Sequence, residues 1–172
     1  SQLVTVIAGV SLICWIMFSL IKIIPPTGTV ESSWYSSYFT RPELTYFYIY
    51  FEPQKIIFFG RTLIRNCAIF TEAPMFTWHL ISALLAELFL NKKVSVIRTV
   101  ILVLAIISTV STMGYIFGLG ALILRLIIAV LRSRKYKDLK KGTKTVIWIA
   151  AAAVIIAAGV VSLLLLKEKL IT

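Results

Sequence analysis

The apolar stretch TVILVLAIISTVSTMGYIFGLGALILRLIIAVL, residues 99–131, decides how the whole chain is organised. About 20 helical residues cross a bilayer, so these roughly 33 residues are too long for one upright span and short for two full ones. Their middle, residues 108–114, carries the polar sequence STVSTMG. The stretch therefore predicts a short helical hairpin, with arms at 99–112 and 114–131 and a polar turn between them.

The basic segments on either side of this stretch support the hairpin. Residues 91–98 contain two lysines and an arginine, and residues 132–144 contain seven basic residues against one acid. Such clusters mark cytoplasmic loops of membrane proteins. Two cytoplasmic ends require an even number of crossings, so the polar turn is expected on the external side.

The composition places the chain among integral membrane proteins. Hydrophobic residues make up 59% of it and charged residues only 15%, and the mean hydropathy is +0.94. The lysines and arginines gather beside apolar runs, so the net charge of +11 reflects which loops are cytoplasmic and does not indicate a polyanionic partner. We therefore expect a lipid bilayer as partner and no nucleic acid.

Three further spans are predicted, at residues 3–24, 74–90 and 146–166. Pro25 and Pro26 end the first one, and Pro74 suits the first turn of the second. The polar and aromatic residues 25–73 form a large external loop along the membrane surface, where their rings serve as interfacial anchors or stack on sugars. The expected fold is an all-α, polytopic transmembrane helix bundle, a single membrane domain over residues 1–172. Because the chain opens on Ser1 and stops after an apolar run, we expect it to be a fragment that lacks helices at both ends.

The sequence RNCAIFTEAPMFTWH, residues 65–79, holds the polar groups that meet the second span. Arg65 carries a planar fork of donors that matches a diphosphate or a carboxylate, and Arg61 lies four residues before it. Glu72 could accept a proton or orient Arg65. His79 falls two helical turns after Glu72, on nearly the same face. This junction and the turn at 108–114 are predicted to open on the same external side.

Each of these groups also has a structural interpretation. Arg65 and Glu72 could form an interfacial ion pair, and His79 could simply pack. Glu87 is expected to snorkel to the cytoplasmic interface without a functional role. Cys14 and Cys67 are expected to be free thiols.

Other chemistries lack their motifs. The chain has no phosphate-binding glycine loop, no nucleophile elbow and no paired histidines of a metal site. We expect no metal and no cofactor.

Two segments resemble a known family. Residues 65–74 resemble the arginine, glycine, isoleucine, phenylalanine and glutamate–proline pattern of O-antigen ligases and polysaccharide repeat-unit polymerases, and residues 109–115 resemble the serine, threonine and glycine motif one helix later in the same proteins. The resemblance covers roughly residues 55–130. The chain departs from it at Ala68, where the pattern has glycine, and at Met113, where it often has threonine or arginine.

The resemblance implies a metal-independent glycosyltransferase of the bacterial cytoplasmic membrane. It would act externally on glycans linked to undecaprenyl diphosphate, with other polysaccharide-export membrane proteins as further partners. Arg65 and Glu72 would be catalytic. The substrate-binding residues would be Arg61, His79, Ser111 and Thr112.

Three functions remain open from the sequence. A polymerase would join repeat units, and the residues of the two motifs favour this function. A ligase would move the finished glycan to a lipid or protein acceptor. A non-enzymatic polytopic protein, such as a transporter subunit, would use Arg65 and Glu72 only as a structural pair.

Overall fold

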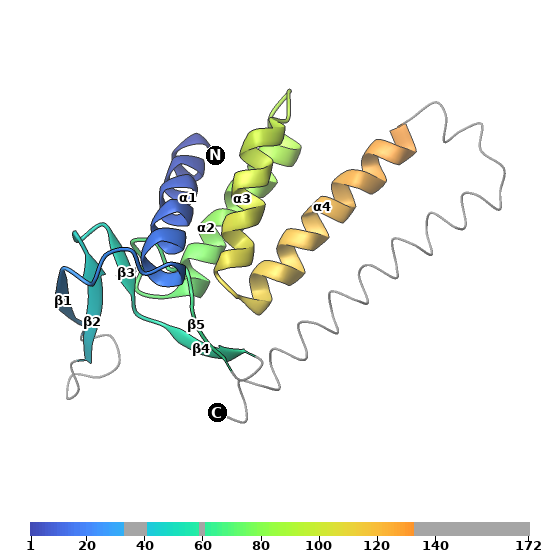
Figure 1. Ribbon diagram of the computed structural model, residues 1–172. Coiled ribbons are helices and arrows are strands. Elements are labelled where there is room, and N and C mark those ends of the chain that lie inside the picture. Colours follow the sequence, from blue (N-terminus) through green and yellow to red (C-terminus); the bar gives the residue numbers. More distant parts are fainter. Residues whose placement is uncertain (33–40, 59–60, 133–172) are drawn as a thin grey trace.

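The computed structural model describes residues 1–32, 41–58 and 61–132. Helix α1 (Gln2–Cys14) continues into the π-helical segment η1 (Trp15–Leu20), and α2 (Ala73–Leu85) continues into η2 (Ala86–Leu90). Helices α3 (Val96–Ser108) and α4 (Thr112–Arg132) follow (Figure 1). The predicted span 146–166 and nearly all of the predicted cytoplasmic loop 132–144 lie outside the described residues.

Three of the described helices are long and apolar enough to cross a membrane. They are the continuous helices Gln2–Leu20, Ala73–Leu90 and Thr112–Arg132. Helix α3, with 13 residues, is apolar but shorter. At 1.5 Å per residue it reaches about 20 Å, less than a hydrocarbon core. Helices α3 and α4 meet at residues 109–111, inside the stretch in which the sequence predicts a turn.

The all-α prediction is wrong, because the chain between α1 and α2 contains two antiparallel sheets. Strands β1 (Gly28–Ser32), β2 (Arg41–Tyr46) and β3 (Tyr50–Glu52) form one sheet in that order. Strands β4 (Lys55–Phe58) and β5 (Arg61–Ile64) form a separate two-stranded sheet. The fold is mixed, and what was expected as an irregular loop is a small β layer.

Local chemistry explains these strands. Tyr, Phe, Ile and Thr favour extended backbone, and they are frequent in β2 to β5. Between β2 and β3 the chain turns through Phe47 and Tyr48, whose φ angles are 53° and 56°. The N–H of Ile49 donates to the carbonyl of Tyr46 at 3.0 Å and closes the turn. Two left-handed residues in succession match the twist of a hairpin, although glycine or asparagine usually occupies them.

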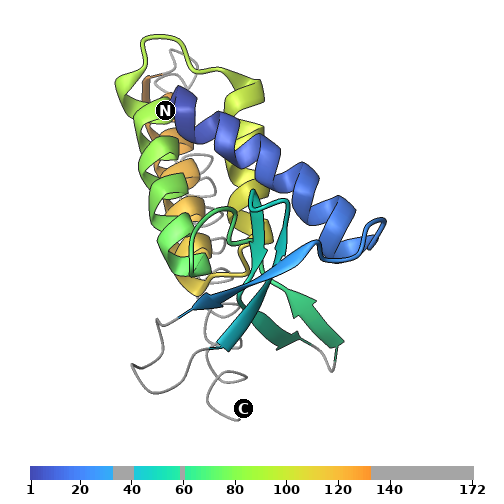
Figure 2. The same ribbon diagram turned by 90° about the vertical axis from the view of Figure 1, so that its left-hand side faces the viewer.

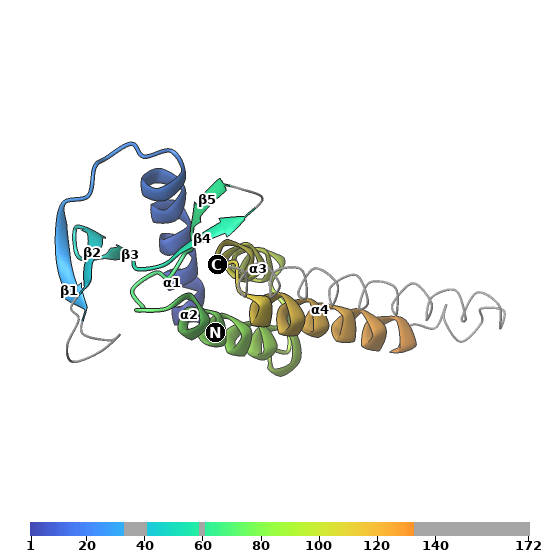
Figure 3. The same ribbon diagram turned by 90° about the horizontal axis from the view of Figure 1, so that it is seen from below.

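The β layer lies at one end of the helices. In Figures 1 and 2 the strands gather below the end of α1, the start of α2 and the junction of α3 with α4. Figure 3, viewed from below, shows β4 and β5 beside the same helix ends. The polar loop that precedes α2 is therefore enclosed between helix ends and strands.

Close packing holds the helices together. A Cβ atom added at Gly114 would lie 3.0 Å from the Cγ2 atoms of both Ile106 and Thr77, so α4 touches α3 and α2 at this point. Ala8 of α1 is fully buried in the same core. The large buried side chains of the core come from α2 and α3, namely Phe76, Leu80, Leu84 and Leu102.

Glu87 connects the helices at the end opposite to the β layer. The prediction that its side chain reaches the membrane interface is wrong. Its side chain is completely buried. Its carboxylate accepts from the N–H of Ser95 at 2.8 Å and from the amide of Asn91 at 2.6 Å, and lies 3.4 Å from Nε of Arg98. Since Ser95 caps α3, this carboxylate fixes the connection between the second and third helices.

A polar and aromatic contact joins the first helix to the larger sheet. The hydroxyl of Ser19 donates to the carboxylate of Glu52 at 2.7 Å and lies 2.9 Å from the hydroxyl of Tyr50. Phe18 stacks on Tyr46 with ring centroids 4.6 Å apart. The sheet is thereby attached to the end of the helix through side chains of both kinds.

The contact makes stability sensitive to alkaline pH. Burial, together with the charge and hydrogen bond of Glu52, raises the pKa of Tyr46 from 10.0 to about 12. The neutral phenol is favoured in the folded state, so its contribution is complete below pH 10.0 and is lost as the pH rises toward 12. We expect the free energy of unfolding to fall across this window by less in Tyr46→Phe than in the wild type. Chemical unfolding at several pH values checks this, with the exposed Tyr48→Phe as control, and an identical decline in all three proteins would contradict it.

Candidate functional site

Arg65 lies where the β layer meets the helix ends. It directly follows β5, and its side chain is 94% buried, with a relative exposure of 6%. Nε donates to the carbonyl oxygen of Thr109 at 2.9 Å, and Nη1 donates to Oε1 of Gln54 at 2.9 Å. The two segments that the sequence placed on one side, residues 65–79 and 108–114, are thus in direct contact.

The guanidinium keeps one donor without a partner. Nη2 of Arg65 is buried and makes no hydrogen bond. Burial lowers the pKa of Arg65, against smaller opposing contributions that include the charge of Glu72. A buried cation with an unused donor is costly, and an anion bound beside it would remove much of that cost.

Thr112, at the start of α4, carries a second unused buried polar atom. Its Oγ1 is buried and has no partner. It begins α4, three residues after the carbonyl group of Thr109 that holds Arg65. Unsatisfied buried polar atoms are rare in folded proteins, and these two belong to segments that contact each other through Arg65 and Thr109, which marks a candidate ligand site.

Asn66 builds the junction around these atoms. Its amide nitrogen donates to the hydroxyls of Ser11 and Ser108, at 3.2 and 2.9 Å. Its Oδ1 accepts from the N–H of Ala68, and its own N–H donates to the carbonyl of Ser108. One fully buried side chain therefore joins the loop to α1 and to the end of α3. This role of Asn66 was not predicted from the sequence, although an amide side chain beside apolar residues must find hydrogen-bond partners when it is buried.

Ala68 occupies the position at which the family pattern has glycine. Its φ is 53°, in the left-handed region, where a side chain is strained and glycine is not. It is also almost completely buried. The backbone at residue 68 thus has the conformation that a glycine would adopt without strain.

Cys14 and Cys67 are free, as expected. Cys67 is completely buried, and its Sγ lies 3.6 Å from the carbonyl of Arg65. Burial raises the pKa of the Cys67 thiol to about 12, with Arg65 opposing the shift. Because thiolates and not thiols are nucleophilic, Cys67 is inert packing.

Glu72 and His79 stand in different surroundings. Glu72 is half-buried in extended backbone at the start of α2, and its charge acts on Arg65. His79 is exposed, and its ring stacks on Phe70 with centroids 4.7 Å apart. Nδ1 of His79 lies 2.8 Å from the carbonyl of Met75 and must donate, since a carbonyl only accepts. The charge of Glu72 therefore acts on Arg65, whereas His79 contacts Met75 of its own helix and Phe70 of the preceding loop.

The two remaining predicted residues belong to different segments. Arg61 begins β5, and its backbone pairs with Phe58. Ser111 is buried in the turn between α3 and α4, where its carbonyl accepts from the N–H of Tyr115 at 3.1 Å. Val110 beside it has φ 45°, so the turn is tight. Within residues 1–32, 41–58 and 61–132, no three His, Cys, Asp or Glu residues gather as a metal site.

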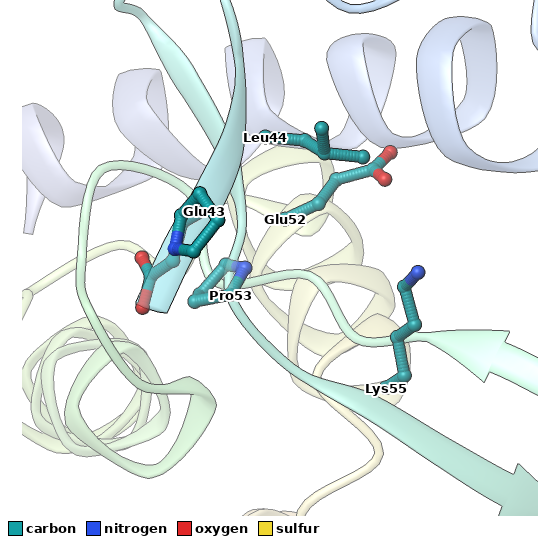
Figure 4. Close-up of a pocket in the computed structure, with 6 residues that line it drawn as sticks. Glu43, Leu44, Glu52, Pro53 and Lys55 are labelled. Atoms are coloured by element: carbon teal, nitrogen blue, oxygen red, sulfur yellow. The ribbon is translucent and has the colours of Figure 1, made fainter. Parts of the chain in front are cut away.

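A separate cavity of about 210 Å³ lies within the β layer. It is lined by Pro42, Glu43, Leu44, Glu52, Pro53 and Lys55 (Figure 4). In that view the side chains of Glu43 and Glu52 project in opposite directions. They do not form the facing pair of carboxylates that acid–base catalysis on a sugar uses.

Comparison with known proteins gives no relative for this chain. No family model matches it, and no curated protein or solved structure matches it either. The resemblance of residues 65–74 and 109–115 to polysaccharide polymerases and ligases stays a prediction from those residues.

The left-handed backbone at Ala68 predicts how this position responds to substitution. Ala68→Val places a β-branched side chain at φ 53° in a buried site, so we expect a loss of about 2 kcal/mol or more in the free energy of unfolding. Ala68→Gly should fold normally, because relief of strain offsets the lost methyl group. Thermal unfolding in detergent measures both, and equal stability of the two variants would show that the backbone is not constrained here.

The unused hydroxyl of Thr112 predicts a stabilising substitution. Thr112→Val replaces an unpartnered buried oxygen by a methyl group of the same shape, so the free energy of unfolding should rise by about 1 kcal/mol. The control is Thr109→Val, in which the hydroxyl that donates to Ile106 at 2.7 Å is lost. That variant should be destabilised. If Thr112→Val is the less stable of the two, the hydroxyl has a partner within the fold.

Proposed function

We propose that this chain belongs to a bacterial polysaccharide polymerase, a membrane glycosyltransferase that joins repeat units carried on undecaprenyl diphosphate at the external side of the cytoplasmic membrane. The observation that carries the proposal is the unused Nη2 of Arg65, a buried donor on a fixed cation. It lies where the two segments that resemble this family meet. The three apolar helices long enough to cross a membrane agree with such a location.

In this proposal Arg65 binds the diphosphate leaving group. As the bond between the sugar and the diphosphate breaks, negative charge grows on the leaving oxygen, and a cation held in place stabilises it without reorganisation. Nε and Nη1 are held by Thr109 and Gln54, which leaves Nη2 to meet the substrate. The hydroxyl of Thr112 would donate to a second phosphate oxygen.

Glu72 has a supporting role in the same proposal. Its charge favours the protonated guanidinium of Arg65 against the cost of burial. It would either keep Arg65 charged and oriented or accept the proton of the acceptor hydroxyl. Arg61 and His79 would bind more distant parts of the substrate, and Ser111 would shape the turn beside Thr112.

The test is Arg65→Lys in the intact gene, read as the ladder of surface polysaccharide on a gel with protein abundance checked by immunoblot. Lysine keeps the charge but loses the planar fork, so long glycans should fall about a hundredfold at normal abundance. The matched control is Arg98→Lys, which changes the arginine paired with Glu87 at the other end of the helices. It should leave the ladder unchanged.

The opposite result has a definite meaning. If Arg65→Lys gives a full ladder, the bonds to Thr109 and Gln54 are the whole role of the side chain. The chain would then be a non-enzymatic membrane protein in which Arg65 fastens a loop to a helix turn.

Polymerase and ligase differ in the acceptor, which the described residues do not distinguish. The same ladder separates them. Loss of polymerase activity leaves acceptors with a single repeat unit, whereas loss of ligase activity leaves full-length glycan on the undecaprenyl carrier.

A further inference from the structure

A second cavity, distinct from the Arg65 junction, gathers cationic side chains at the end of the first helix. Its volume is about 320 Å³. It is lined by Ser19, Leu20, Lys22, Lys55, Thr62, Leu63 and Ile64. Two lysines that are far apart in the sequence thus face one space, and no carboxylate is among the lining residues.

The cavity lies where a lipid headgroup would be. The candidate span Gln2–Leu20 ends at its edge. The side chains of Leu20, Ile21 and Ile23 are 46%, 62% and 57% exposed, so the surface beside the lysines is apolar. Nε1 of Trp15 donates to the carbonyl of Ile64 at 2.8 Å and holds β5 against the helix. Cations beside an exposed apolar surface at the end of a span match a phosphate headgroup above acyl chains.

Lys22 occupies an unusual backbone position for a lysine. Its φ is 56°, and it ends the helix, with the N–H of Ile23 donating to the carbonyl of Met17 at 3.0 Å. Glycine or asparagine is preferred there, because a side chain at positive φ is strained. Within the part of the chain that the structure describes, neither Lys22 nor Lys55 is in an ion pair. The cations are therefore available to a ligand.

A carboxylate adjoins this cavity through the lining residue Ser19. Glu52 accepts from Ser19 at 2.7 Å and lines the neighbouring cavity, which it shares with Lys55. Figure 4 shows the side chain of Lys55 extending from the start of β4, and Lys55 lines both cavities. One lysine thus contributes to both spaces, and Lys22 adds a second positive charge only to the larger one.

We propose that this cavity binds the phosphate headgroup of an anionic membrane lipid, with Lys22 and Lys55 as its ligands and Thr62 as a further hydroxyl donor. An anionic headgroup such as phosphoglycerol carries no ammonium that the two lysines would repel, whereas phosphocholine does. The lipid would hold the end of the first span and the β4–β5 hairpin at headgroup level. This site does not depend on the proposed glycosyltransferase activity.

The experiment uses the purified full chain in nanodiscs of phosphatidylglycerol or phosphatidylcholine, with bound lipid measured by native mass spectrometry. We expect retained phosphatidylglycerol in excess of phosphatidylcholine. Affinity should fall about fivefold in Lys22→Gln and about thirtyfold in the double variant Lys22→Gln/Lys55→Gln, since each lysine near a membrane surface contributes ~1 kcal/mol.

Two controls separate specific binding from general charge attraction and from misfolding. Lys92→Gln/Lys93→Gln removes two exposed lysines from the opposite end of the helices and should bind the lipid as the wild type does. Lys22→Gly removes the charge and relieves the backbone strain, so it should fold at least as well and still lose binding.

Three results would overturn the proposal. The first is unchanged lipid retention in the double variant. The second is an equal loss in the Lys92 and Lys93 control, which would indicate nonspecific attraction. The third is a thermal stabilisation of the protein by soluble glycerol phosphate that equals its stabilisation by phosphatidylglycerol. That result would identify a free anion as the ligand.

Discussion

The described fold depends on one buried amide, that of Asn66. Polar backbone that leaves a helix within an apolar surrounding must find partners, because water is not there to supply them. Asn66 supplies four at once, to Ser11, to both the hydroxyl and the carbonyl of Ser108, and to the N–H of Ala68. The neighbouring Arg65 then reaches the carbonyl of Thr109. Two consecutive residues thereby join α1, the end of α3 and the loop before α2.

This constraint explains why the atoms proposed to bind a ligand and the atoms that hold the fold together are neighbours. A loop that had to satisfy its polar atoms only by itself would leave no donor for a ligand. Here Asn66 bonds the N–H of Ala68 and the carbonyl of Ser108. Gln54 accepts a hydrogen bond from one nitrogen of Arg65. One further guanidinium nitrogen stays unused. The surrounding hydrogen bonds offset the free-energy cost of leaving that donor unpaired. Such local costs are common at binding sites.

The sequence predicted the helices better than the strands. Apolar runs of sufficient length identify spans directly, and the polar residues 108–114 located the turn between α3 and α4. The hairpin between β2 and β3 carries no such sign, since Phe47 and Tyr48 stand at left-handed positions where asparagine and glycine are usual. Aromatic residues in a membrane chain were interpreted as interfacial anchors. Only the folded structure reveals that Tyr46 of β2 stacks on Phe18 of the first helix. This contact attaches the sheet to the helix.

The site was predictable only in part, for a similar reason. Arg65 and the turn near Thr112 could be selected from residue type, because an arginine beside a predicted span and a cluster of hydroxyl residues within an apolar stretch both stand out. Their partners could not, since Gln54 and Thr109 are ordinary residues whose importance comes from being brought to Arg65 over separations of 11 and 44 residues. Ala68 lies between these cases. Its departure from a glycine pattern was visible in the sequence, yet only its φ of 53° shows that the backbone has a conformation that glycine favours while carrying a methyl group. A position that departs from the family pattern therefore has the backbone that a glycine there would favour, and the strained residue lies next to the amide that holds the helices together.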